Sequence, residues 1–238
     1  MNTTPVPEPP PLALTVATSH KMVDELLSWK IDKTYNFEIP TTDGVANIKV
    51  TTRHSPRNVE EYWVLRQVDF SQVGENVEEL HYKLIRYHTG SMTDVETCHW
   101  GYEKEYYTAI YQADIEPWRD NTVLDDNLAV FRVTRRYRYP FPLSNRVFFH
   151  AGYVSKRDQE LLVVQLPLQP YGTNNDTVGR YKLVDRIRYD PKKKQLTWEF
   201  VSAVHPGGLV PDALMRVALP SIIARDVPAF FKWASKQD

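Results

Sequence analysis

The sequence predicts an α+β fold in which a curved antiparallel sheet of about nine strands wraps round a long C-terminal helix, with an apolar pocket between them. Two observations carry this prediction. Short segments with alternating apolar residues and polar turns follow one another for most of the chain, a pattern typical of an antiparallel meander. Residues 209–236 then change to the apolar spacing of an amphipathic helix.

The composition is that of a globular domain. Of the 238 residues, 42% are hydrophobic and 25% are charged, which is ordinary for a folded soluble chain large enough to enclose a cavity. The net charge of −1 gives no global attraction for nucleic acid, so we expect no nucleic-acid partner. Cys98 is the single cysteine of the sequence, which excludes an intramolecular disulfide and favours a reducing compartment.

The N-terminal segment is rich in proline and is expected to form an extended, flexible tail over residues 1–16. Residues 17–238 are expected to form one ligand-binding domain. The segment lacks the basic start and apolar core of a signal peptide, and no apolar run approaches the roughly 18 residues of a membrane-spanning helix. We therefore expect a cytoplasmic protein that contacts membranes only transiently.

The first half of the chain alternates between helical and strand patterns. Residues 18–29 predict a short helix capped by Ser19, because Met22, Leu26 and Trp29 recur at helical spacing. A second helix is expected over residues 76–88, where Asn76 and Glu79 match a capping box. Its apolar stripe contains Val77, Leu80, Leu84 and His88. Strands are expected at residues 35–39, 46–52 and 62–70.

From residue 105 onward the period returns to two. Short turns rich in proline, glycine, asparagine and aspartate separate the segments, so consecutive strands are expected to pair antiparallel. Strands are expected at residues 105–115, 128–138, 146–155, 160–167, 179–189 and 195–204.

The C-terminal helix is expected to bend. Pro211 suits its first turn, whereas Pro220 and Pro228 lie inside the helical pattern and each removes a hydrogen bond. Its predicted inner face carries Leu214, Val217, Ala218, Ile222, Val227, Phe230 and Phe231. Small residues on this helix leave room for a cavity, namely Ala213, Ala218 and Ala224. A twisted sheet of this size curls round such a helix, the arrangement called a helix-grip fold.

Several local strings resemble the START (StAR-related lipid-transfer) family, and most closely a poorly characterised fungal START-like branch of it. Residues 139–148 (YPFPLSNRVF) look like the family's P-x-P-L-S-x-R-x-F turn, and residues 206–211 (PGGLVP) resemble its entry into the last helix. Further similar positions are Trp63, Arg66, His88, Glu103–Tyr107, Trp198, Asp226, Val227, Phe231 and Trp233. The resemblance covers residues 60–235. It implies a cavity for a lipid, a sterol or another hydrophobic small molecule, used for transport or sensing.

Three charged residues fall on apolar faces of predicted strands: Arg66, Arg135 and Asp185. A charge buried there is costly unless it is paired, and a charged pair in an apolar cavity resembles the cavity pair of START proteins. We expect these residues to anchor the polar end of a ligand. The alternative is that the strand register is shifted by one and the charges lie at the surface.

The remaining residues predicted to line the cavity are mostly aromatic. On the strands they are Tyr107, Tyr111, Tyr137, Phe149, Trp198 and Phe200, and on the C-terminal helix they are Leu214, Ala218 and Ile222. For most of the aromatic residues an ordinary core position is the competing interpretation.

No cofactor or metal is expected. His81, His88, Cys98 and His99 do not have a known metal-ligand spacing, and no phosphate-binding loop, nucleophile elbow or dinucleotide fingerprint is present. Catalysis is uncertain and is less expected than ligand binding. It would need an acid–base pair such as His150 or His205 with Asp185.

Three hypotheses remain open from the sequence. The first is a carrier or sensor of a hydrophobic ligand, and the second is a polyketide cyclase-like enzyme that uses the same cavity. The third is an interaction domain whose interior is filled by aromatic side chains. Lys192–Lys194 form either a solvated turn or a weak contact with an anionic membrane, and the polar loop at residues 170–179 is either a lid or an ordinary hairpin loop.

Overall fold

The computed structural model describes residues 5, 8, 12–56, 61–118, 127–139, 141, 143–171, 176–208 and 210–237. The helices are α1 (Leu12–Leu27), α2 (Val77–Lys83), α3 (His99–Tyr106) and α4 (Asp212–Ala234), with a 3-10 turn η1 (Gly74–Asn76) before α2 and a π-helix η2 (Leu84–Thr89) after it. The strands are β1 (Ile31–Thr41), β2 (Gly44–His54), β3 (Trp63–Asp69), β4 (Ile110–Pro117), β5 (Leu128–Tyr137), β6 (Arg146–Arg157), β7 (Glu160–Pro167), β8 (Thr177–Asp190) and β9 (Gln195–His205).

Within the described residues the strands form one sheet of nine strands, in the order β1-β2-β3-β9-β8-β7-β6-β5-β4. Neighbours in this order pair antiparallel, and β6 and β8 also meet in a short parallel contact beyond the end of β7. The return of β9 to lie beside β3 joins the N-terminal hairpin to the C-terminal meander. The expected sheet is therefore confirmed.

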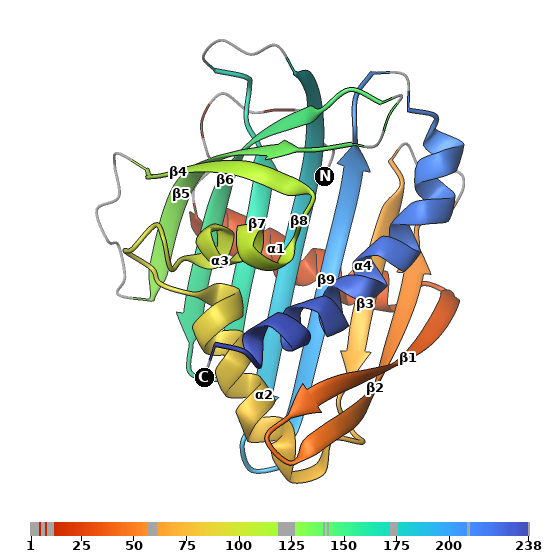
Figure 1. Ribbon diagram of the computed structural model, residues 1–238, viewed down its shortest axis with the longest axis vertical. Helices are drawn as coiled ribbons and strands as arrows, with labels where there is room; N and C mark the ends of the chain where they lie inside the picture. The colour runs from red at the N-terminus through yellow and green to blue at the C-terminus, as the bar shows by residue number, and fades with distance from the viewer. Residues whose placement is uncertain are drawn as a thin grey trace.

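The helices cover the two faces of the sheet differently (Figure 1). Helix α4, together with α2, η2 and α3, crosses one face, which we call the α4 face. Helix α1 lies behind the sheet and packs on the opposite face, the α1 face, against β3, β7 and β9. Because apolar residues are buried on both faces, several strands read as continuous apolar runs, and β6 is buried over its first ten residues.

Helix α4 shows the gripping arrangement directly. It is continuous from Asp212 to Ala234, and Pro220 and Pro228 lie inside it without ending it. Its N-terminal part runs in a different direction from the rest (Figure 1). The C-terminal half packs into the largest apolar cluster through Val227, Phe230 and Phe231, which are almost fully buried. The α+β helix-grip prediction is confirmed.

The predicted start of the first helix and the predicted capping box of the second are wrong. Helix α1 begins at Leu12, inside the range expected to be a tail, and Ser19 is a buried mid-helix residue whose hydroxyl donates to the Thr15 carbonyl oxygen at 2.7 Å. At α2 the Asn76 side chain donates backwards to the Val73 carbonyl oxygen, so no capping box forms. The 3-10 turn before α2 places Asn76 in a helical conformation, in which its side chain is directed away from the next turn.

Helix α3 was not expected, because residues from 105 onward were interpreted as a strand. The strand β4 begins only at Ile110. Trp100 of α3 packs against Gly152 of β6 so closely that a Cβ at position 152 would overlap the indole ring. A glycine on the sheet therefore lets this short helix approach the α4 face.

Within the described residues, no helix has both the length and the apolar character that crossing a membrane requires.

Candidate functional site

A small cavity lies on the α4 face, between α4, α3, η2 and the strands β3, β8 and β9. Its volume is about 30 Å³, which is room for about two water molecules. Charged and aromatic side chains line it together: Arg66, His88, His99, Glu103, Tyr106, Tyr107, Leu183, Asp185, Trp198, Phe200, Asp226 and Phe230.

Arg66 of β3 is the buried cation of this site, with 1% of its surface exposed. Its Nη1 donates to the Ile223 carbonyl oxygen of α4 at 3.1 Å, and its guanidinium carbon lies 4.4 Å from the ring centre of Trp198 and 4.7 Å from that of Phe200. Within the described residues, Nε and Nη2 have no hydrogen-bond partner. Burial lowers the pKa of Arg66, and the planar cation is left with two unused donors.

Asp185 of β8 is held by two donors from different elements. His88 Nε2 donates to Oδ2 at 2.9 Å, and the indole N–H of Trp198 donates to Oδ1. Burial alone would raise the pKa of Asp185, but the charges of His88 and Arg66 and the His88 hydrogen bond bring it below its usual value. This carboxylate therefore stays ionised in the interior.

His88 reaches Asp185 because the helix locally changes its winding. It lies in the π-helix η2, a distortion that often marks functional sites. The helix ends at Gly90, whose φ of +64° and close approach to the Thr97 carbonyl require glycine. The other ring nitrogen of His88, Nδ1, is buried and has no hydrogen-bond partner within the described residues.

His99 at the start of α3 contacts His88 through a hydrogen bond and a ring contact. Its Nδ1 donates to the His88 carbonyl oxygen at 2.6 Å, and the two rings meet edge to face with centres 4.9 Å apart. Burial and the neighbouring His88 lower the pKa of His99 to about 4. The ring is therefore neutral near neutral pH and accepts at Nε2, which lies 3.4 Å from Gln165 Nε2.

Arg135 of β5 belongs to a separate pair. It forms an ion pair with Glu103 of α3, and its Nη2 donates to Gln165 Oε1 at 2.6 Å. The Tyr181 hydroxyl donates to the same Gln165 oxygen. Arg135 and Asp185 thus lie in one polar layer, but each is neutralised by a different residue.

Asp226 of α4 completes the cavity from the helix side. It is partly buried, and no hydrogen bond or ion pair to it is found within the described residues. Burial raises the pKa of Asp226 to about 7, although the Arg66 charge opposes the shift. Near neutral pH this carboxyl is therefore partly protonated.

Most predicted strand residues lie where they were expected. Arg66, Tyr107, Asp185, Trp198 and Phe200 line the cavity. Arg135 and Tyr137 are on the same face, with the Arg135 guanidinium 5.7 Å from the Tyr137 ring centre and the Tyr107 and Tyr137 rings 6.3 Å apart. The structure therefore brings the three predicted charges, Arg66, Arg135 and Asp185, into one interior layer.

Two strand residues do not face the cavity. Tyr111 is 40% exposed and its hydroxyl donates to Asp176 at 3.2 Å. Phe149 lies on the α1 face, where its ring is 4.8 Å from that of Tyr171. The orientation expected for Phe149 was wrong because β6 is buried on both faces, so no alternation of apolar and polar residues fixes its register.

The predicted inner face of α4 is wrong in the N-terminal half of the helix, whereas Val227, Phe230 and Phe231 of the C-terminal half are buried as predicted. Leu214 is 53% and Ile222 42% exposed, and Ala218 is half-buried and does not line the cavity. The buried residues of this half are Leu219 and Ile223, which pack against Val64 of β3. The N-terminal half of α4 is apolar on several sides, so its helical spacing alone gave no unique inner face.

Sequence reasoning missed His88, His99, Glu103, Tyr106 and Asp226 as parts of the site. A usable signal existed for His88, because it was a polar residue in the apolar stripe of its helix, the same signal that singled out Arg66. Within the described residues, neither His150 nor His205 forms a hydrogen bond or ion pair with Asp185. His150 Nε2 lies 3.5 Å from the Tyr181 hydroxyl, and His205 Nε2 lies 4.0 Å from Glu61 Oε1. Within the described parts of the chain, no three metal-binding side chains converge.

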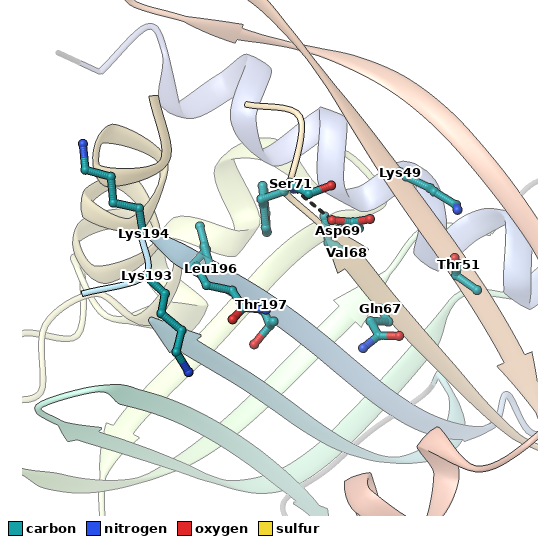
Figure 2. A pocket seen from close by; sticks show the side chains of 12 residues that line it. Lys49, Thr51, Gln67, Val68, Asp69, Ser71, Lys193, Lys194, Leu196 and Thr197 are labelled. Carbon is teal, nitrogen blue, oxygen red and sulfur yellow. Dashed lines mark hydrogen bonds between the residues drawn. The ribbon is translucent and has the colours of Figure 1, made fainter. Parts of the chain in front are cut away.

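A larger hollow of about 610 Å³ lies where β3 ends beside the β8–β9 turn (Figure 2). Its lining is mostly polar, and its charges are largely balanced. Lys194 pairs with Glu75, Lys193 lies 3.5 Å from Asp190, and the Asp69 carboxylate accepts the Ser71 N–H at 2.9 Å. A hydrophobic ligand needs walls that are mostly apolar, so this groove is a poorer candidate for the ligand site.

Two solved human structures share the fold. The protein titled "Crystal structure of human STARD10" superposes with a TM-score of 0.66 and 13% identity, covering 96% of this chain and 81% of that one. "Human StAR-related lipid transfer protein 5" superposes with a TM-score of 0.55 and 13% identity, covering 94% of this chain and 98% of that one. At these identities the likeness shows a START-like fold alone.

No curated protein matches the chain by sequence. A family model described as "Protein of unknown function (DUF3074)" matches residues 63–234, a range that runs from the start of β3 to the end of α4 and leaves out α1, β1 and β2. The matched range holds every residue that lines the buried cavity. The chain therefore belongs to the DUF3074 family, and its fold is START-like.

Proposed function

We propose that this protein binds a lipid, a sterol or another hydrophobic small molecule between α4 and the sheet, and transfers or senses it. The charged side chains that line the small cavity on the α4 face are the observation that supports this proposal. Arg66, His88 and Asp226 each offer polar atoms without a protein partner within the described residues, in a place otherwise walled by aromatic rings. Such a site fixes the polar end of a largely apolar ligand.

The volume of the cavity implies that α4 must move to admit a ligand. Sites for lipid-sized molecules span about 300–1,000 Å³, whereas this cavity holds about 30 Å³. The two halves of α4 differ in packing. Phe230, Phe231 and Trp233 anchor the C-terminal half through edge-to-face ring contacts with Trp198, Phe70 and Tyr87. Leu214 and Val217 of the N-terminal half are exposed. We infer that the N-terminal half opens.

Several finer expectations belong to this proposal. They are transport between membranes, transient contact with an anionic membrane through Lys192–Lys194, a cytoplasmic location and membership of a fungal START-like branch. Phe141 supports membrane contact, because it is 96% exposed and a large exposed apolar side chain favours an interface.

A second candidate, an acid–base enzyme of the cyclase kind, is favoured by one observation. The His88 ring is oriented by Asp185, as a general base would be, and Asp226 beside it is partly protonated near neutral pH. Turnover of a polyketide mimic that is lost in His88→Gln would favour this candidate over binding alone.

Ligand binding is tested by filling the cavity. Leu183→Trp places a larger side chain at the cavity wall, and Phe149→Trp is the matched control on the α1 face. In titrations with fluorescent sterol and fatty-acyl probes, Leu183→Trp should lose most binding, while Phe149→Trp keeps it. Circular dichroism must show that both variants are folded. Binding that is equally strong in both would place the ligand elsewhere.

A further inference from the structure

The free edge of Arg66 indicates what kind of polar group the cavity accepts. A guanidinium is planar, and its Nε–H and one Nη2–H point in the same direction as a two-pronged donor. In Arg66 both of these nitrogens lack a partner within the described residues, while Nη1 is used by the Ile223 carbonyl. Two parallel N–H donors match the two oxygens of a carboxylate better than a single hydroxyl.

The volume of the cavity beside Arg66 also fits a carboxylate. The cavity has room for about two water molecules, and a carboxylate presents two oxygen atoms of similar size. Beyond the polar groups its walls are Leu183, Trp198, Phe200 and Phe230. A polar group that fills this space is therefore expected to continue into an apolar chain or ring.

The charges that face Arg66 leave it without a full counter-ion. Asp185 of β8 is shared with His88 of η2 and with Trp198, and Glu103 of α3 pairs with Arg135 of β5. His99 of α3 is neutral near neutral pH, and Tyr106 and Tyr107 stay protonated, since burial raises the pKa of both hydroxyls.

Asp226 of α4 is then the remaining acid that faces Arg66. It has no hydrogen-bond or ion-pair partner within the described residues, and it is partly protonated near neutral pH because burial raises its pKa to about 7. When Asp226 is protonated, Arg66 is a buried cation that lacks its own anion, and a neutral Asp226 adds a donor instead of a repelling charge.

We propose that the ligand is a hydrophobic carboxylic acid, and that Arg66 holds its carboxylate side-on through Nε and Nη2 while the apolar part lies between α4 and the sheet. This inference rests on the proposed function and specifies its ligand class. It predicts a preference for the acid over an alcohol or an ester with the same chain.

Affinity for the acid should also depend on pH. A fatty carboxylate in water stays ionised from about pH 6 to about pH 8, since a carboxyl group titrates near pH 4. Over the same range Asp226 gains a proton as the pH falls. Acid binding should therefore strengthen toward about pH 6, whereas binding of the alcohol should not change.

The experiment compares palmitic acid, its methyl ester and the corresponding alcohol as competitors of a fluorescent fatty-acyl probe. Three variants are used with the wild type: Arg66→Gln, Arg66→Lys and, as a matched control, Arg180→Gln, which removes an exposed arginine of β8. Loss of the two donors should weaken acid binding roughly 10–100-fold in Arg66→Gln. Arg180→Gln should bind like the wild type, and Asp226→Asn should bind the acid without the pH dependence.

The outcomes separate this inference from the proposed function. If none of the three competitors displaces the probe and the probe itself does not bind, the proposed function fails. If the alcohol and the ester compete as well as the acid, or if Arg66→Gln weakens all three equally, binding stands and the carboxylate inference is overturned. Arg66→Lys keeps a positive charge but lacks the two side-on donors. It therefore tests the carboxylate inference if Arg66→Gln does not fold. A loss confined to the acid in Arg66→Lys supports the proposal.

Discussion

The buried Asp185 is the most sensitive position of the polar layer. Asp185→Ala removes the acceptor of His88 Nε2–H and of the Trp198 indole N–H. It also removes the negative charge that most raises the pKa of Arg66. All of these groups are buried. When one partner of a buried ion pair is removed, the other is left as an uncompensated buried charge, and the free energy of unfolding typically falls by about 3–5 kcal/mol.

For a chain of this size, such a loss lowers the melting temperature by roughly 6–20 °C. Urea unfolding followed by tryptophan fluorescence, with thermal unfolding followed by circular dichroism, measures it. Asp69→Ala is the matched control, because the exposed Asp69 accepts, among the described residues, only the Ser71 N–H and should change the free energy of unfolding by no more than about 0.5 kcal/mol.

A double-mutant cycle with His88→Ala isolates the pair. We expect a coupling energy between Asp185 and His88 of about 0.5–3 kcal/mol. The pKa of Asp185 is lowered in the folded protein, so its contribution is present above about pH 4 and is lost as the pH falls further. A loss of less than about 1 kcal/mol in Asp185→Ala, or no coupling to His88, would refute the geometry described for this site.

Three further predictions follow from single contacts. Gly152→Ala should lower the free energy of unfolding by about 1–3 kcal/mol, because the new Cβ would overlap the Trp100 ring, and chemical denaturation measures this. Asp226→Asn should stabilise the protein by roughly 1–3 kcal/mol more at pH 8 than at pH 5. The reason is that the raised pKa of Asp226 makes its stabilising protonated form disappear as the pH rises through about 7, and an equal effect at both values would contradict it. Arg135→Leu should destabilise the fold by about 3–5 kcal/mol as well as weaken binding, since it leaves Glu103 unpaired, and an unchanged melting temperature would show that the pair is not formed.

The strands could be predicted from the sequence because their physical signal is local. Alternation along β3 placed Arg66 on the face of Val64 and Val68, and that is where the structure has it. The same reasoning placed Asp185 correctly on β8. It failed for Phe149, because β6 is buried on both faces and has no alternating polar residues that show which side chains face the cavity.

The helical part of the site depended on contacts that a local pattern does not contain. Helix α3 spans eight residues with polar and aromatic side chains mixed round it, and it is fixed by the packing of Trp100 on Gly152. The π-helix that positions His88 arises inside an ordinary helical pattern and is held by the bond of His99 to the His88 carbonyl. Pairings that join residues so distant in sequence follow from tertiary packing.

The partners of the buried charges could not be predicted by considering each strand separately. Burial of Arg66, Arg135 and Asp185 could be predicted, because each lay among apolar neighbours on its strand. Their partners lie on η2 and α3, which were not recognised as parts of the site. Arg135 therefore turned from an expected ligand anchor into half of an ion pair with one unpartnered nitrogen, Nε. Within the described residues, Arg66 keeps both Nε and Nη2 without a hydrogen-bond partner.

The most direct test of the account is native mass spectrometry of the protein purified from its own host, followed by extraction and identification of the bound molecule. We expect a one-to-one adduct with a hydrophobic small molecule that has a carboxylate end, and we expect this adduct to be absent from Arg66→Gln. A protein that carries no adduct, and that also takes up no lipid, sterol or fatty acid when these are supplied, would contradict the proposal of an internal ligand site.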